Sequence, residues 1–194
     1  MKHFSSRFLG YLLENVYFCH EIIIIMATNL TTIKEIYTIV MEGMALLTNY
    51  LRERVIAHIE ERHPNDDWHN HYRKALTAKN RDGSLKAKKL LEEWDADHIV
   101  NIQNLKVFIF ENKWHISIPV HDEHKYEETK RSLNGLVEAV TKRSVQHRFV
   151  HYTPIQIFND MITIAENMGN TNLSEQLNKL SDEVASIEEG RVQT

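Results

Sequence analysis

The stretch that decides the fold is TTIKEIYTIVMEGMALLTNYLRERVIAHIEER, residues Thr31–Arg62. Its apolar residues recur at intervals of three and four, which places them on one face of an α-helix. They are Ile33, Ile36, Ile39, Val40, Met44, Leu47, Leu51, Val55 and Ile59. Thr31 and Thr32 are residue types that cap helix N-termini, and His63-Pro64-Asn65-Asp66 stops the pattern. The pattern predicts a helix that begins after the two threonines, ends at Arg62 and is long enough to organise a domain.

The composition favours one helix-rich domain around this helix. The chain has 194 residues, of which 42% are hydrophobic and 26% charged, with only 6 Gly and 3 Pro. A chain of this size can bury one core, and the scarcity of turn-forming residues predicts an all-α fold. With so little glycine, a Gly-rich phosphate loop or a dinucleotide fingerprint is excluded.

Charge and cysteine content exclude further classes of protein. The formal net charge is −4, so whole-molecule electrostatics do not draw this chain onto nucleic acid, and any polyanion site must be a local patch. The single Cys19 excludes an internal disulfide framework and a zinc site built on thiolates. It is compatible with the reducing cytoplasm, where we place the protein.

Residues 1–28 are predicted to be an N-terminal extension, which Met26-Ala27-Thr28 would leave upstream of a natural start site. The apolar run Phe8–Leu13 follows two cations, as in a secretory signal, but no small-residue cleavage site appears. Polar residues interrupt the hydrophobic region, namely Glu14, Asn15, His20 and Glu21. The longest uninterrupted apolar run, Ile22–Ala27, is far short of the roughly 18 to 20 residues that span a bilayer. We therefore expect neither export nor membrane insertion.

The middle of the chain predicts buried helix. Asp67–Ala75 is predicted to form a short helix or a wrapped loop. Asp95 and Asp97 open a helix that is predicted to run toward Trp114. Its apolar residues nearly encircle the axis, so we expect it in the centre of a bundle. Val107–Phe110 is also compatible with a strand because of its β-branched and aromatic residues, although the flanking period favours helix.

The C-terminal part has the clearest helix boundaries. A helix from Asp122 to about His147 is followed by one that begins at Thr153-Pro154 and stops at Gly169. These elements complete a predicted domain at 29–170. Residues 171–194 are predicted to form an acidic amphipathic helix with a frayed tail from Glu188. Its apolar positions are Leu173, Leu177, Leu180, Val184 and Ile187.

Residues 142–151 concentrate the chemistry of the chain. Arg143 and His147 are four residues apart, hence on one face of a helix. A fixed cation beside a titratable imidazole suits a reaction at phosphate, because one holds the anion and the other moves a proton. Lys142, Arg148 and His151 add to a segment that contains no acid. The alternative is a solvated helix end whose cations complement the helix dipole.

Two further groups of residues are weaker candidates. A basic stretch runs from Arg73 to Lys89 and includes Lys86 and Lys88; it is either a solvated face or a patch that follows a phosphate backbone. The histidines cluster at His69/His71 and at His115, His121 and His124. Neither cluster has the helical spacing of a metal site, so no metal is predicted.

The order of these elements resembles the HEPN superfamily over about residues 30–170. The resemblance rests on Ile36–Leu51, on Asp66-Asp67-Trp68, and on Leu105–Trp114. It continues in the apolar pattern Leu133, Leu136, Val137 and Val140 that leads into the basic segment, and in Tyr152-Thr153-Pro154. The similar branch occurs as a C-terminal domain in a eukaryotic nuclear RNA-quality-control endoribonuclease and in bacterial defence proteins.

The resemblance implies a helical bundle that dimerises and cleaves RNA without metal or other cofactor, through two copies of an Arg-x4–6-His motif. The family histidine matches His147, and the family arginine aligns with Lys142, which Arg143 follows. Lysine neutralises phosphate but lacks the planar fork of arginine, whereas Arg143 is one residue too close to His147 for the pattern. The motif therefore departs from the family at its cation.

Three functions remain open from the sequence. The first is an RNA-binding protein of toxin or anti-phage type, with cleavage by His147 and either Arg143 or Lys142; Arg148, His151, Lys86, Lys88 and Lys89 would hold RNA. The second is an inactive module that dimerises or docks an antitoxin or a partner nuclease. The third is a helical protein with no nucleic-acid role.

Overall fold

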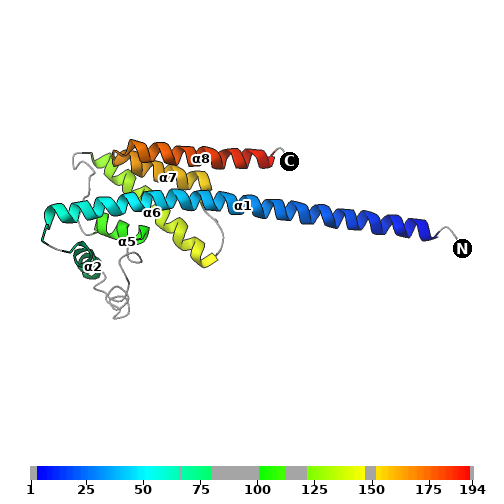
Figure 1. Cartoon of the computed structure of the whole chain (residues 1–194), viewed down its shortest axis with the longest axis horizontal. Helices are drawn as coiled ribbons and strands as arrows, with labels where there is room; N and C mark the ends of the chain where they lie inside the picture. Colours follow the sequence, from blue (N-terminus) through cyan, green and yellow to red (C-terminus); the bar gives the residue numbers. More distant parts are fainter. Residues whose placement is uncertain (1–3, 66, 80–100, 112–121, 147–151, 193–194) are drawn as a thin grey trace. The chain divides into compact units, whose positions relative to one another are not determined.

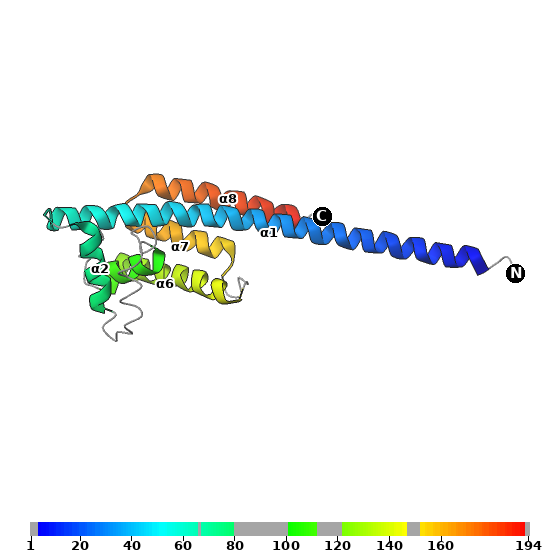
Figure 2. The same ribbon diagram turned by 60° about the horizontal axis from the view of Figure 1, so that its bottom comes forward.

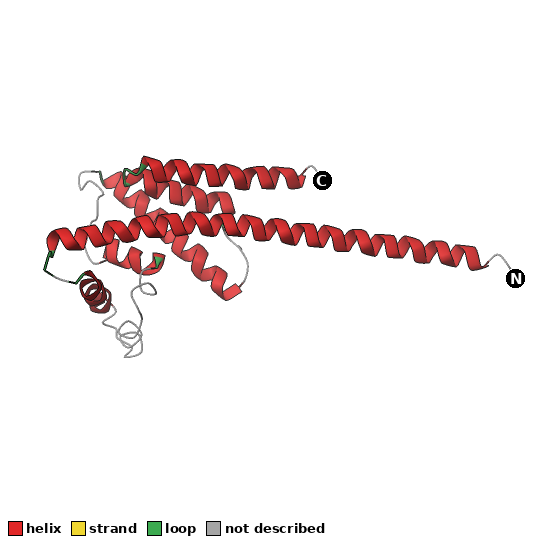
Figure 3. Ribbon diagram, viewed as in Figure 1, coloured by secondary structure: helices red, strands yellow, loops and turns green. Residues whose placement is uncertain are grey.

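Helices form every regular element that the structure describes, which confirms the predicted all-α class (Figure 3). The computed structural model describes residues 4–65, 67–79, 101–111, 122–146 and 152–192. Within these ranges, residues 4–30, 75, 77–79, 111, 141–146 and 191–192 are described by their backbone alone.

The elements follow one another in the order α1 (Phe4–Arg62), α2 (Trp68–Lys79), α5 (Ile102–Lys106), the π-helix η1 (Val107–Glu111), α6 (Glu123–Gln146), α7 (Pro154–Asn167) and α8 (Thr171–Val192) (Figure 1). The chain divides into two compact units, Met1–Ile39 and Val40–Thr194. The first contains the N-terminal part of α1. The second contains the rest of α1 and all other elements, and it is the unit that carries the candidate sites.

The predicted start of the first helix is wrong. The helix α1 begins at Phe4, well before Thr31 and Thr32, and continues without interruption to the predicted end at Arg62. Residues 11–42 contain neither glycine nor proline, so nothing in the backbone stops helix propagation through the threonines. The predicted limits of the N-terminal extension, residues 1–28, stay a prediction.

In the second unit, α1 buries the predicted apolar face. Met44 is 7% exposed and Val40 is 2% exposed, and the positions that follow at helical spacing are at most 1% exposed. These enclosed positions are Leu47, Leu51, Val55 and Ile59. The spacing read from the sequence therefore identifies the core face correctly from Val40 to Ile59, whereas Ile33, which is predicted to belong to the same face, is 50% exposed.

The segment predicted to lie in the middle of a bundle is buried and helical. Phe108, Ile109 and Phe110 are consecutive buried residues of η1, so the strand alternative for this segment is wrong. Asp95 and Asp97, where the predicted helix starts, lie outside the described residues; within the described residues the helix begins at Ile102. Asn101 before it is extended, with its side chain accepting a hydrogen bond from the backbone N–H of Asn104 (3.0 Å). A π-turn widens the helix and allows adjacent bulky residues to be buried together.

The helices α6, α7 and α8 pack in sequence beside the Val40–Arg62 part of α1 (Figures 1 and 2). Thr153 caps α7 in a reciprocal capping box with Gln156, and Pro154 occupies the first turn, as predicted. Gly169, at φ +75°, ends α7 with a left-handed turn that leads directly into α8. The boundaries of α6 agree with the prediction within one residue, whereas α8 continues to Val192 through the predicted frayed tail.

A close approach and a hydrogen bond hold this bundle to α1. A methyl group at Gly43 would lie 2.8 Å from Cε1 of Phe158, so only glycine lets α1 and α7 approach this closely. The hydroxyl of Tyr50 donates to the carbonyl oxygen of Met168 (3.3 Å).

Within the ranges described, no helix combines the length and the apolar character needed to cross a membrane.

Candidate functional site

The predicted catalytic residues fall at the C-terminal end of α6. Lys142 and Arg143 belong to the last turns of that helix, which are described by their backbone. His147, Arg148 and His151 lie outside the described residues. Lys86, Lys88 and Lys89 also lie outside them, so the structure does not test whether these cations converge.

Described contacts fix the two helix ends that flank residues 147–151. The hydroxyl of Tyr152 donates to Oε2 of Glu138 (3.3 Å), which brings the chain back to α6 two turns before its end. The next residue, Thr153, accepts a hydrogen bond from the backbone N–H of Gln156 (3.2 Å) and caps α7. The acid-free segment is therefore joined at both ends to helices that pack on each other.

A half-buried carboxyl group lies at the α6–α7 interface near this segment. Burial raises the pKa of Asp160, although the hydrogen bond from Ser132 and the charge of Arg131 oppose that rise. A methyl group at Gly135 would lie 2.6 Å from Oδ2 of Asp160, so this glycine makes room for the carboxylate. The arrangement is a polar contact between two helices.

An apolar groove opens where α1 meets α6 and α7. Its floor is formed by buried residues, and two of its rim residues, Met41 and Val140, are each 41% exposed. The lining residues are Val40, Met41, Met44, Leu136, Ala139, Val140 and Ile157. Because Val140 precedes Lys142 by two residues, the groove adjoins the α6 turns that carry the predicted cations.

The corner between α1 and α2 contains a second group of chemically active side chains, which we call the ring corner: Arg52, His58, His63, Asp67, Trp68, His69, His71 and Arg73. The rings of Trp68 and His69 stack with centroids 3.6 Å apart, and those of His63 and His71 stack at 4.2 Å. The guanidinium carbon of Arg52 lies 6.0 Å from the centroid of the Trp68 ring, within the range of a cation–π interaction.

Two polar groups complete the ring corner. Asp67 accepts the backbone N–H of His69 (3.2 Å) and lies 3.3 Å from Nδ1 of the same histidine, so this carboxylate caps α2. Burial, followed by the positive charge of Arg62, lowers the pKa of His58. The second unit thus places imidazoles, an indole and arginines together at one surface.

This geometry separates the two histidines that the sequence pairs. His69 stacks on Trp68, whereas His71 stacks on His63 from the end of α1. No group of three or more His, Cys, Asp or Glu side chains within the described ranges is arranged to hold a metal ion. His115 and His121 lie outside those ranges, and His124 is exposed at the start of α6.

The ring corner was missed as a unit by the sequence reasoning. Arg52 and His63 precede the helix stop, and Trp68 and His71 follow it, so no spacing rule joins them. The available signal was the density of rings on both sides of a tight helix–helix connection. Only the packing of α2 against η1, through Tyr72 and Phe108, shows which rings meet.

Comparison of the chain with family models, with curated proteins and with solved structures finds no match. The functional argument therefore depends on residues and geometry.

Proposed function

We propose that this chain is a cytoplasmic, HEPN-like RNA-binding protein that cleaves RNA without a metal ion, through His147 and the cation at Arg143 or Lys142. One observation carries the proposal. Lys142 and Arg143 occupy the last turns of α6, at the start of a segment to 151 that holds cations and imidazoles but no acid. In a chain of net charge −4, such a segment is a local site for a polyanion.

The proposed reaction needs only the groups of this segment and the RNA itself. His147 takes the proton from a ribose 2′-hydroxyl, and the resulting oxygen attacks the adjacent phosphorus. A bond from the 2′-oxygen to phosphorus forms, the bond from phosphorus to the 5′-oxygen breaks, and the leaving oxygen receives a proton from the imidazolium. The products are a 2′,3′-cyclic phosphate and a 5′-hydroxyl.

The cation of the pair stabilises charge on the phosphate oxygens during this attack. Arginine would do so with two parallel hydrogen bonds, whereas lysine would act as a point charge. Separate substitutions can therefore identify which of the two serves. Because the nucleophile is the 2′-hydroxyl, DNA is not a substrate.

The decisive experiment is RNA cleavage in EDTA by the full chain and its variants. Wild-type protein should cut a labelled single strand, and His147→Ala and either Arg143→Ala or Lys142→Ala should lose about 100-fold or more in rate. Lys179→Ala, an exposed cation on α8, is the matched control and should cut normally. Intact RNA after incubation with wild-type protein at high concentration would overturn the cleavage proposal.

The holding residues have a separate readout. Neutralising Lys86, Lys88 and Lys89 together, or Arg148 and His151 together, should weaken RNA retention and reduce its salt dependence. Retention that does not depend on salt concentration would contradict a phosphate-directed role for these residues.

A second candidate function is an inactive module that dimerises or docks an antitoxin or a partner nuclease. The apolar groove with its exposed rim, Met41 and Val140, is the observation that favours it. Met41→Lys should abolish self-association measured by sedimentation equilibrium if a second copy fills the groove. A monomeric wild-type chain would leave docking of a different protein as the form of this function to pursue.

A further inference from the structure

The ring corner is built on a firmly docked helix. Tyr72 and Leu76, one turn apart on α2, are buried at 0% and 1% exposure, and the ring of Tyr72 packs 5.1 Å from that of Phe108 in η1. The other faces of α2 remain partly exposed. Because the buried face sets the rotation of the helix, it also sets the positions of the half-buried His69 and Arg73, which lie beside Tyr72 and Leu76 at helical spacing.

The outer ring of one stack remains accessible. The side chain of His69 is 36% exposed, although one of its faces lies against Trp68. Arg52 also lies 6.0 Å from the centroid of the Trp68 ring, so the indole contacts both a guanidinium group and the imidazole of His69 that stacks on it. A further flat ring can extend such a stack, as aromatic side chains of nucleic-acid-binding proteins do with unstacked bases.

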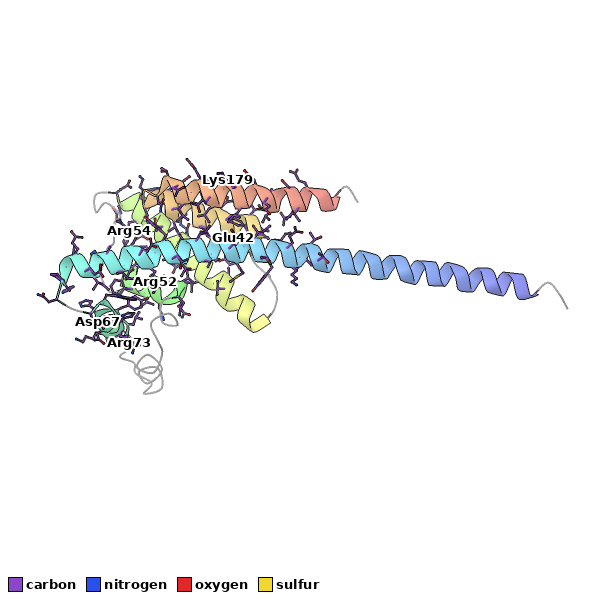
Figure 4. The ribbon with its side chains drawn as sticks, viewed as in Figure 1. Glu42, Arg52, Arg54, Asp67, Arg73 and Lys179 are labelled. Atoms are coloured by element: carbon purple, nitrogen blue, oxygen red, sulfur yellow. The ribbon has the colours of Figure 1, made fainter. Side chains whose placement is uncertain are left out.

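A cation follows His69 at helical spacing on α2. Arg73 follows His69 by four residues on α2, which places it on the same face, one helical turn away. Figure 4 shows Asp67 and Arg73 at α2, and Arg52 on the adjoining part of α1. Asp67, the acid at this position, is engaged by the backbone and the ring of His69. The phosphate of a base stacked on His69 would lie on the side of α2 that carries Arg73.

We propose that the ring corner binds one unpaired nucleotide of an RNA strand, with the base stacked on His69 and the phosphate held by Arg73. This inference rests on the proposed RNA-binding function and specifies its substrate as single-stranded RNA. A base-paired nucleotide cannot present its face to a protein ring, because its neighbours in the duplex cover both faces.

The second stack extends the platform. His63 and His71 lie on each other at 4.2 Å, and His71 follows Trp68 by three residues on α2. These two rings therefore lie next to the Trp68 side of the proposed nucleotide. They give the strand a second flat surface that requires no sequence-specific hydrogen bond, so the corner should accept any base.

The experiment measures binding of a 2′-O-methyl oligouridylate, which lacks the nucleophile for cleavage, to the full chain. A blunt-ended duplex of two complementary 2′-O-methyl strands of the same length is the comparison ligand. His69→Ala and Arg73→Ala should each weaken binding of the single strand by about tenfold, the effect of losing one stacked base or one phosphate contact. The duplex should bind more weakly than the single strand, and its affinity should not change in either variant.

Two controls remove folding and general charge as explanations. Arg131→Ala removes the same charge from an exposed position on α6, where Arg131 acts electrostatically on Asp160 at the α6–α7 interface. It should bind RNA as wild type does. In a chain with Trp94→Phe and Trp114→Phe, Trp68 is the remaining indole, and the single strand should quench its fluorescence if the base stacks at this corner.

The outcomes separate this inference from the function on which it rests. Equal affinities of wild type, His69→Ala and Arg73→Ala for the single strand, without quenching of Trp68, would overturn the ring-corner proposal. The RNA-binding function would survive that result if Arg143→Ala weakened the same binding. Absence of binding of any strand by wild-type protein would overturn both.

Discussion

The bundle of α6, α7 and α8 and the ring corner differ in how they use polar side chains. In the bundle, polar groups bond one another across helices: Asn167 donates to Glu128 (3.0 Å), and Ser174 donates to Glu166 (3.1 Å). In the ring corner, flat side chains stack in pairs and stay half-exposed. Closed polar pairs stabilise a fold, whereas exposed stacks present a surface. The comparison predicts that the first region contributes more to stability, whereas the second carries the proposed binding surface.

The largest test of this division is Phe158→Ala in α7. Phe158 is fully buried, and its ring lies against α1 at Gly43. Truncating this side chain to alanine leaves a cavity that the neighbouring helices cannot close easily. We expect a loss of about 3–5 kcal/mol in the free energy of unfolding, measured by urea denaturation.

The matched control for that loss is Val140→Ala, on the neighbouring α6 and 41% exposed. It should change the free energy of unfolding by less than about 0.5 kcal/mol. If the two variants lost similar stability, the bundle would not be the stabilising region that the comparison requires.

The next effect concerns the cap of α7. Thr153→Ala removes the hydroxyl that accepts a hydrogen bond from the backbone N–H of Gln156. The second hydrogen bond of the capping box, from the backbone N–H of Thr153 to Oε1 of Gln156 (2.9 Å), does not involve the removed group. We expect a loss of about 1 kcal/mol in the same denaturation experiment.

Thr171→Ala serves as its control, because Thr171 also begins a helix but does not cap it; Asn170 accepts the N–H of Leu173 there. That variant should stay within about 0.5 kcal/mol of wild type. Equal losses of stability in the two variants would mean that threonine at a helix start affects stability through its helix propensity and not through capping.

The helix boundaries and buried faces show which parts of the fold could be predicted from the sequence and which could not. The Thr153-Pro154 start of α7 follows from local chemistry, since a cap and its partner lie three residues apart. The buried face of α1 follows equally from its apolar spacing. Local rules failed where no residue forces a boundary, as at Thr31 in α1 and Glu188 in α8, because a helix continues until something stops it.

The two candidate sites also differ in whether they can be predicted from local sequence. The acid-free segment at 142–151 was recognisable because its residues are consecutive in the chain. The ring corner joins Arg52 and His63 of one helix end to Trp68 and His71 of another helix, and its stacks exist only after Tyr72 and Leu76 dock α2. A sequence can show that these rings are near in the chain, but the rotation of α2 decides which of them meet.

A smaller effect, of opposite sign, is expected within the corner itself. The hydroxyl of Tyr72 is buried and has no hydrogen-bond partner among the described residues, and burial raises its pKa. Tyr72→Phe removes a desolvated polar atom and keeps the ring against Phe108, so the free energy of unfolding should rise by up to about 1 kcal/mol. A loss of stability would show that the hydroxyl is bonded in solution and that the corner is as fully closed as the bundle.

The smallest effect sharpens the comparison most, because acid should act on the two regions in opposite directions. The pKa of His58 is lowered by burial and by Arg62, with Glu61 opposing and His63 and Arg54 adding to the decrease. Unfolded His58 therefore takes up a proton more readily than the folded form. The stability that it contributes is complete above its unfolded pKa of 6.5 and is lost as the pH falls from there toward the folded pKa.

For Asp160 the sign is reversed. Burial raises its pKa, so the folded protein holds this proton more tightly than the unfolded chain does. Its contribution is complete below the unfolded value of 3.8 and is lost as the pH rises through the folded pKa. Acidification from neutral pH should thus weaken the ring corner and strengthen the α6–α7 interface. Both effects should be small, because each group remains partly solvated.

Amide hydrogen exchange across a pH series separates the two signs by location. After correction for intrinsic rates, amides of residues 54–62 and 68–74 should lose protection on acidification relative to those of 129–139. His58→Gln should remove the first trend and leave the second, and Asp160→Asn should do the converse. If both trends persisted in both variants, other groups would control the acid response and the two regions would not differ in the way their buried charges indicate.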